Sequence, residues 1–224
     1  LLFWGVATLA LDGYRCFGIS LSSERLLLGQ KPYSDFLAQP GLPATSVWNL
    51  EGPDTTGGPA SDLRHYINSQ HIAQLSAEFI NAILAQTISG DSIVGRVRSA
   101  LRAGKYPLIS LQQGTNGHTV VAYDLRGDGG GGYWIDVYDC NTEFLAAENS
   151  QAYSHQYREE QSRIHVTSSG NWAFDSLGWS GGPRSLFVVS PTSIPVQPTM
   201  PDSIAGLLTI IFGDAARTSQ VANS

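Results

Sequence analysis

The sequence carries few charges, two cysteines and no long hydrophobic run. Charged residues account for 14% of the 224 residues, and the formal net charge is −6 at pH 7. The basic residues are scattered along the chain, unlike the basic patches that bind nucleic acid or anionic membranes. The apolar stretches 1–11 and 204–213 are too short to cross a bilayer. We therefore expect neither a nucleic-acid partner nor a membrane span.

Cysteine and histidine are too sparse for a structural metal site. Cys16 and Cys140 offer a single possible pair, which does not make a disulfide framework. The chain has no CxxC or HExxH pattern, and its five histidines are dispersed. Zinc sites need closely spaced ligands of these types. The sequence therefore predicts no metal and no cofactor.

Apolar residues recur with two different periods along the chain. They make up 42% of the residues, enough for a sizeable core, and helical spacing covers 16–28, 61–87 and 92–103. Asp91 is the expected N-cap of the last helix, and Gly104 its end. Further on, the runs YPLISLQQ, GHTVVAYDL, YWIDVYD, RIHVTSS and SLFVVS predict antiparallel strands. The pattern indicates an α+β fold with N-terminal helices packed on a C-terminal antiparallel β-sheet.

Proline and serine mark the end of this expected domain. Residues 190–203 read SPTSIPVQPTMPDS, a composition that resists regular structure and suits an extended strap or linker. We place one domain at 1–190, and at 191–224 a strap or linker with a short apolar segment that leads out of the domain. The chain opens with LLFWGVATLAL, without an initiator methionine or a basic stretch. We expect this domain to be part of a longer polypeptide.

The stretch TNGHTVVAYDLRGDGGGGYWIDVYDCN predicts a hairpin. The glycines of RGDGGGG permit the positive φ angles of a hairpin loop, and the segment lacks the repeat that a calcium-binding loop of this kind needs. If the strands cover 118–125 and 132–139 and close symmetrically, His118 lies directly opposite Asp139. Side chains in such a pair are close enough to hydrogen-bond. Asn141 is then the diagonal neighbour of His118.

Cys16 stands at the head of the first expected helix, where a nucleophile would be favoured. A helix N-terminus favours a thiolate over a thiol. A histidine within reach accepts the thiol proton and later returns it to the leaving group, and a third polar group orients the imidazole. Cys16, His118 and Asp139 are therefore candidates for these three roles, although a lone cysteine is more commonly a small buried apolar residue. Cys140 is expected to point to the opposite face and to be structural.

The segments GYRCFGIS, GHTVVAYDL and YWIDVYDCN resemble papain-like cysteine peptidases, in particular bacterial peptidases that process bacteriocins. In that family a cysteine heads a helix, a histidine opens a strand, and an aspartate or asparagine closes the next strand. The resemblance implies a papain-like fold and hydrolysis of peptide or isopeptide bonds through a thioester. It makes Cys16 the nucleophile, His118 the base and acid, and Asp139 the orienting residue, with Asn141 as the alternative. The implied partner is a peptide or protein substrate.

The chain departs from the family pattern just ahead of the nucleophile. Papain-like enzymes generally carry a glutamine there whose amide helps to form the oxyanion hole, and no glutamine precedes Cys16. Gln113 is the first candidate to replace it, because its strand leads into the loop before His118. The other candidates are Gln112, Tyr14 and Thr8.

Other functions fit the same residues. An inactive papain-like domain that binds peptides or proteins would not need the missing glutamine. An acyltransferase or a cell-wall amidase would use a cysteine and a histidine in the same order. Trp172 and Trp179 either line a peptide groove or pack within turns.

Overall fold

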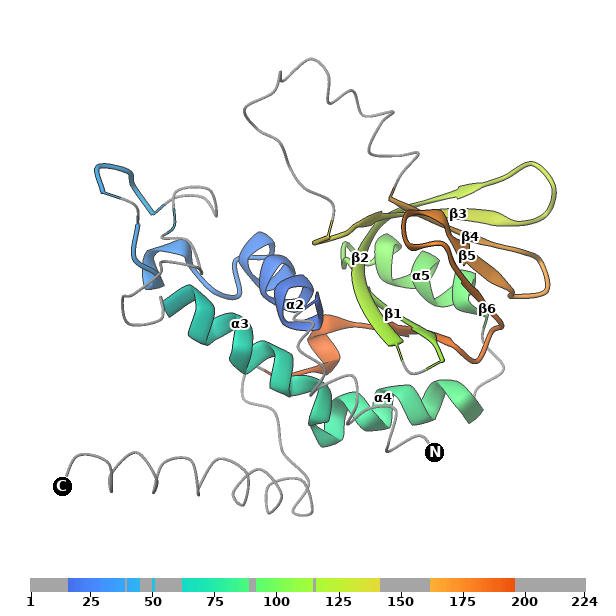
Figure 1. The fold of residues 1–224 in the computed structure, drawn as a ribbon, viewed down its shortest axis with the longest axis horizontal. Coiled ribbons are helices and arrows are strands. Elements are labelled where there is room, and N and C mark those ends of the chain that lie inside the picture. Colours follow the sequence, from blue (N-terminus) through green and yellow to red (C-terminus); the bar gives the residue numbers. More distant parts are fainter. Residues whose placement is uncertain are drawn as a thin grey trace.

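Helices occupy the first part of the chain and strands the second. The structure is a computed structural model that describes residues 16–38, 40–44, 50, 62–88, 92–114, 116–141 and 162–195. Its α-helices are α2 (Cys16–Leu27), α3 (Asp62–Ile72), α4 (Ala77–Ile88) and α5 (Ile93–Arg102). Single 3-10 turns are η1 (Tyr33–Asp35), η3 (Ala73–Leu75), η4 (Asp175–Leu177) and η5 (Pro191–Ser193). This arrangement, drawn in Figure 1, confirms the α+β class predicted from the sequence.

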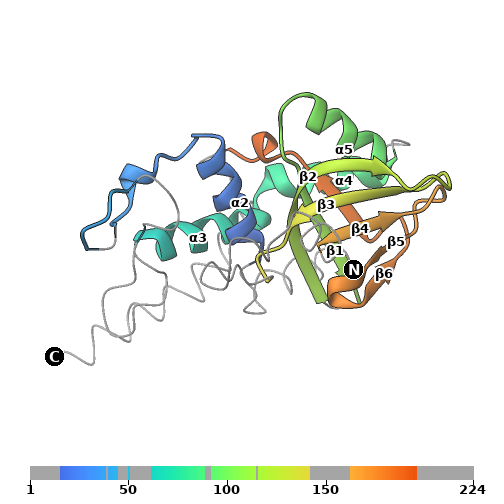
Figure 2. The ribbon, with the colours of Figure 1, turned by 90° about the horizontal axis from the view of Figure 1, so that it is seen from above.

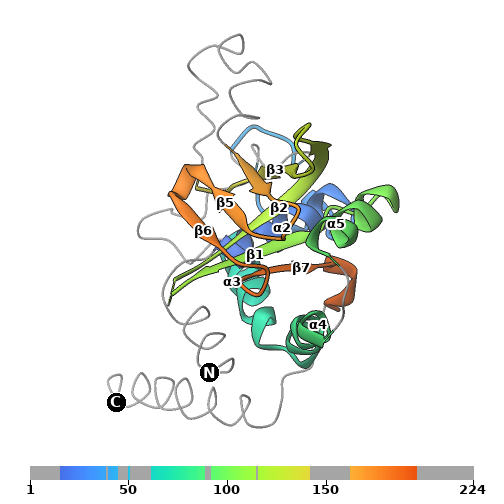
Figure 3. The same ribbon diagram turned by 90° about the vertical axis from the view of Figure 1, so that its right-hand side faces the viewer.

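Seven antiparallel strands form one curled sheet in the order β6-β5-β4-β3-β2-β1-β7. They are β1 (Leu108–Gln113), β2 (Asn116–Gly127), β3 (Tyr133–Tyr138), β4 (Arg163–Val166), β5 (Trp172–Phe174), β6 (Trp179–Gly181) and β7 (Leu186–Val189). The curl brings β6 at one edge near β1, while the last strand, β7, pairs with β1 on its other side (Figure 3). The sequence did not predict β5 and β6, because a three-residue strand is too short to show alternation.

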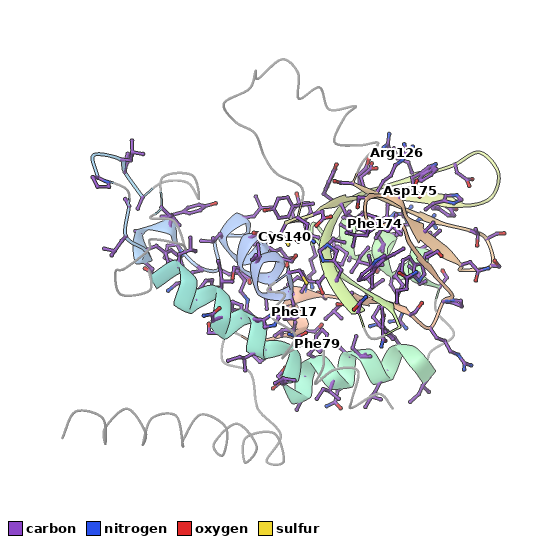
Figure 4. The ribbon with its side chains drawn as sticks, in the orientation of Figure 1. Phe17, Phe79, Arg126, Cys140, Phe174 and Asp175 are labelled. Carbon is purple, nitrogen blue, oxygen red and sulfur yellow. The ribbon has the colours of Figure 1, made fainter. Side chains whose placement is uncertain are left out.

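Each face of the sheet has its own apolar cluster. On one face, Val97 of α5 packs with Val120 and Ala122 of β2 and with buried residues of the other strands. On the opposite face, Phe17 of α2 lies with Val121 of β2, and Phe17 meets Phe79 of α4 edge to face at 5.0 Å (Figure 4). Helix α2 therefore lies between the sheet and α3, and α2 and α3 form one side of the molecule (Figures 1 and 2).

The ends and contacts of the helices follow local sequence signals. Ser92 is the N-cap of α5, because its Oγ accepts a hydrogen bond from the backbone N–H of Gly95 at 3.0 Å. The prediction that Asp91 is the N-cap is therefore wrong; Asp91 itself lies outside the described residues. Gly104 follows α5 with a φ of 68°, as expected for a helix end. Gly18 lets α2 approach α3 closely, since a Cβ there would lie 2.4 Å from the carbonyl oxygen of Ile67.

Arg25, near the end of α2, ties this helix to the residues that follow β7. Its guanidinium is buried, with 1% of the residue exposed. It donates to the side-chain oxygen of Gln70, and to the carbonyl oxygens of Ile194 at 2.6 Å and Pro195 at 3.1 Å. The first residues of the predicted strap are therefore held against α2.

None of the helices in the described part of the chain is long and apolar enough to span a membrane.

Candidate functional site

Cys16 is the first residue of α2 and meets the start of β2. The residue is 7% exposed, and its thiol lies close enough to His118 to raise the pKa of the imidazole. His118 is the third residue of β2, which begins at Asn116. Phe17 and Leu21 of α2 pack with Val121 of β2, and this shared cluster holds the first turns of the helix against the strand.

His118 is held on its other side by Asp139, which follows the last residue of β3. Nε2 of His118 lies 2.8 Å from Oδ1 of Asp139, and 4% and 1% of the two side chains are exposed. The same Oδ1 accepts the backbone N–H of Asn141 at 2.9 Å, which fixes the carboxylate. Because Nε2 faces Asp139, Nδ1 is the ring nitrogen left to face the thiol of Cys16. The side chain of Asn141 is exposed and accepts from the Cys140 thiol at 3.9 Å.

The strand register that brings these residues together differs from the expected one. Val121 lies opposite Tyr138, a shift of two residues that would place Asn141 opposite His118 if the strands continued. The hairpin loop begins two residues later and ends one residue later than expected, which shifts the register by three residues, and the β-bulge in β2 takes back one of them. However, β3 ends at Tyr138, and the turn that follows brings Asp139 to the imidazole. The prediction that His118 lies directly opposite Asp139 in the ladder is therefore wrong, although the two side chains meet.

The environment of His118 favours its protonated form. Burial on its own lowers the pKa of the imidazole, but hydrogen bonds to Asp139 and Cys16 and the negative charges of these two groups outweigh burial and raise the pKa of His118 to about 9. At neutral pH the imidazole therefore carries a proton between a carboxylate and a sulfur.

Two aromatic side chains enclose the imidazole. Phe174 of β5 is stacked on His118, with ring centroids 6.3 Å apart and planes 14° apart. Trp179, the first residue of β6, lies edge-on to His118 at 6.5 Å. Gly178, with a φ of 64°, makes the turn that sets Trp179 on this side of the sheet. These rings lie beside an imidazole of which 4% of the side chain is exposed.

The chain matches no family model, no curated protein and no solved structure. The site is therefore defined by its own geometry, which joins Cys16, His118 and Asp139 from α2, from β2 and from the turn after β3.

The candidate oxyanion donors lie in different places. Leu111 of β1 lies opposite His118, so Gln113, two residues further on, shares the face of His118. Gln112 points to the other face, and its Nε2 donates to the carbonyl oxygen of Gly114 at 3.5 Å. Thr8 and Tyr14 lie outside the described residues.

Cys140 is a free thiol beside the site. It is half-buried, and both it and Cys16 are free. Burial, with the nearby charges of Cys16 and Asp139, raises the pKa of Cys140 to about 12. The two thiols therefore differ sharply in environment although they lie in the same region of the fold.

The glycine-rich tip of the β2–β3 hairpin is closed by hydrogen bonds. Oδ1 of Asp128 accepts the backbone N–H groups of Gly130 and Gly132, and Oδ2 lies 2.8 Å from Nε2 of His165. No group of three or more potential metal ligands occurs among the described residues.

Sequence reasoning missed three parts of the site. The backbone N–H of Asn141 and the ring of Phe174 have no sequence signal, because both depend on how the chain folds back. Trp179 was noted, but only as a groove or turn residue. The aromatic residues of WAFDSLGW were the one available sign of two further strands.

Proposed function

We propose that this chain is a papain-like cysteine peptidase that hydrolyses peptide or isopeptide bonds. The observation that carries the proposal is the continuous buried contact from Cys16 through His118 to Asp139, with the cysteine in the first turn of a helix. A nucleophile, a base in contact with it and a third group that orients the base are the parts that covalent catalysis requires.

The first half of the reaction forms a thioester. The sulfur of Cys16, with its proton transferred to His118, attacks the carbonyl carbon of the substrate. As the C–N bond breaks, the imidazolium donates its proton to the departing amine, so the amine leaves neutral. The raised pKa of His118 keeps that proton available at neutral pH.

The second half regenerates the enzyme. The neutral imidazole takes a proton from a water molecule, whose oxygen attacks the thioester carbon. The C–S bond breaks, the acid product leaves and the proton returns to the pair of Cys16 and His118. Asp139 holds the ring through Nε2 in both halves, so that Nδ1 remains directed at the sulfur.

Alkylation with iodoacetamide at pH 7, with the modified cysteine identified by mass spectrometry, tests the nucleophile. We expect rapid modification of Cys16. We expect slow modification of Cys140, because a thiol with a pKa of about 12 is almost entirely protonated at this pH. Cleavage of a mixed peptide library should be abolished in Cys16→Ala and unchanged in the matched control Cys140→Ala.

Equal and slow alkylation of both thiols, together with no cleavage by the wild-type chain, would contradict the proposal. The alternative function, a domain that binds peptides without cleaving them, would then be favoured. Peptide binding that is unchanged in Cys16→Ala would support this alternative.

A further inference from the structure

A second contact joins α2 to β2 one helical turn after Cys16. The hydroxyl of Ser20 donates to the carbonyl oxygen of Thr119 at 2.9 Å, and Ser20 is fully buried. Thr119 directly follows His118 in β2. Residues four apart lie on the same side of a helix, about 6 Å along its axis. The cysteine and the histidine are thus flanked by a hydrogen bond between their own elements.

The sheet leaves the carbonyl of Thr119 open for this contact. The backbone N–H of Ala122 donates to Pro107, so the even-numbered residues around it in β2 direct their backbone groups towards β1. The carbonyl of Thr119 therefore points to the opposite edge, where pairing with β3 begins only at Val121. Ser20 thus takes the place that the next strand would otherwise fill.

We propose that Ser20 is a positioning residue that sets the distance between the thiol of Cys16 and the imidazole of His118. Apolar packing holds α2 on the sheet, but packing is not directional and permits the helix to slide or roll. The bond from Ser20 to Thr119 is directional and fixes the first turn of α2 relative to the residue beside His118. The inference rests on the proposed function, since the alignment of Cys16 with His118 matters only if Cys16 is a nucleophile.

Several charged or titratable groups surround this position, and the test has to separate them from Ser20. His118 faces Cys16 from β2, and Asp139 and Cys140 lie beyond β3. His71 of α3 packs against Gly18, and Glu24 and Arg25 lie further along α2 itself. A substitution at Ser20 changes none of these charges, so a change in the pH dependence of the thiol reports on geometry.

The experiment measures the rate of alkylation of Cys16 by iodoacetamide between pH 4 and 9 in the full chain. We expect Ser20→Ala to move the midpoint of this profile up by about one pH unit. At pH values below the midpoint, the alkylation rate should then be about tenfold lower than in the wild-type chain. Ser20→Thr, which keeps the hydroxyl, should restore the wild-type profile.

Ser22 provides the matched control. It lies in the same helix and is equally buried, yet its hydroxyl has no hydrogen-bond partner among the described residues. Ser22→Ala should leave the profile unchanged. A folded Ser20→Ala chain with the wild-type profile would overturn the proposal, and so would an equal shift in Ser22→Ala.

If Ser20→Ala does not fold, the isosteric pair Ser20→Thr and Ser20→Val decides. We expect a shifted profile for the valine variant alone, and identical profiles for the two would contradict the proposal. The readout does not need turnover. If the pH profile of alkylation depends on Ser20 but the chain cleaves no peptide, the peptidase proposal is contradicted and the positioning role of Ser20 is supported. If the chain cleaves peptides but the pH profile does not depend on Ser20, the peptidase proposal is supported and the positioning role is contradicted.

Discussion

Two histidine–aspartate pairs in the described part of the chain have equal N–O distances but differ in almost everything else. His118 and Asp139 are 2.8 Å apart with 4% and 1% of their side chains exposed, whereas His165 and Asp128, also 2.8 Å apart, are 29% and 17% exposed. The first pair contacts a thiol. The second holds the glycine loop at the hairpin tip, and its imidazole packs on Trp134 at 4.4 Å. The N–O distance is therefore the same in both pairs, and burial and the neighbouring thiol are what distinguish the pair that we propose to be catalytic.

The largest effect should come from removing each histidine in turn. We expect His118→Gln to lower kcat/KM about 10³-fold or more, because both proton transfers of the proposed mechanism pass through this imidazole. His165→Gln, the same substitution in the other pair, should leave kcat/KM within about twofold. The measurement is steady-state cleavage of a peptide found in the library screen. Equal losses in the two variants would mean that the buried pair has no special role.

The two aspartates provide the next contrast. Asp139→Asn should lower kcat/KM about 10²- to 10³-fold, since an amide fixes the imidazole less firmly and does not stabilise its charge. Asp128→Asn should leave kcat/KM unchanged and slightly lower Tm. Asn141→Ala should also be nearly neutral, because that residue contributes its backbone N–H to Asp139. A large loss in Asn141→Ala with none in Asp139→Asn would reverse the assignment of the third residue.

Gln113 and Gln112 allow a smaller comparison across one strand. If Gln113 donates to the oxyanion, Gln113→Ala should lower kcat about 10²-fold with little change in KM. Gln112→Ala should have no effect, because Gln112 points to the other face of β1. Equal kcat values for the two variants would show that the donor lies elsewhere.

The smallest effect is the dependence of stability on pH. The pKa of His118 is raised from 6.5 to about 9, so its contribution to the free energy of unfolding is complete below pH 6.5 and is lost as the pH rises through 9. The loss should be of the order of 3 kcal/mol or less in urea titrations, and His118→Gln should remove it.

Glu24 has to be separated from this effect. Burial raises its pKa to about 8, against the opposing influence of the Tyr106 backbone N–H and of Arg25. Its contribution is therefore lost between pH 4.5 and 8, in the same direction as that of His118. A Glu24→Gln chain should keep the loss between pH 6.5 and 9. If it does not, the slope belongs to Glu24 and not to the buried pair.

The sequence was sufficient to predict that helices precede strands and to locate five of the seven strands, because apolar periodicity is a local property. It also singled out Cys16, His118 and Asp139, since each stands at the end of an element. It could not provide the register, because the bulge in β2 and the early end of β3 depend on the whole sheet. The pair of His165 and Asp128 was equally invisible, since it requires β4 to lie beside β3 under the hairpin tip.

Arg25 has a practical consequence for where this domain can be cut. The proline- and serine-rich composition suggests a boundary at 190, yet the carbonyl oxygens of Ile194 and Pro195 accept hydrogen bonds from this buried guanidinium. A fragment that stopped at 190 would remove both carbonyl acceptors from this buried cation and would leave it Gln70 and the nearby Tyr66 hydroxyl in the described part of the chain. The helix that would lose this anchoring is α2, which begins with Cys16. Recombinant fragments should therefore extend beyond Pro195, and a protease that clipped the strap before Ile194 would loosen the helix that carries the thiol.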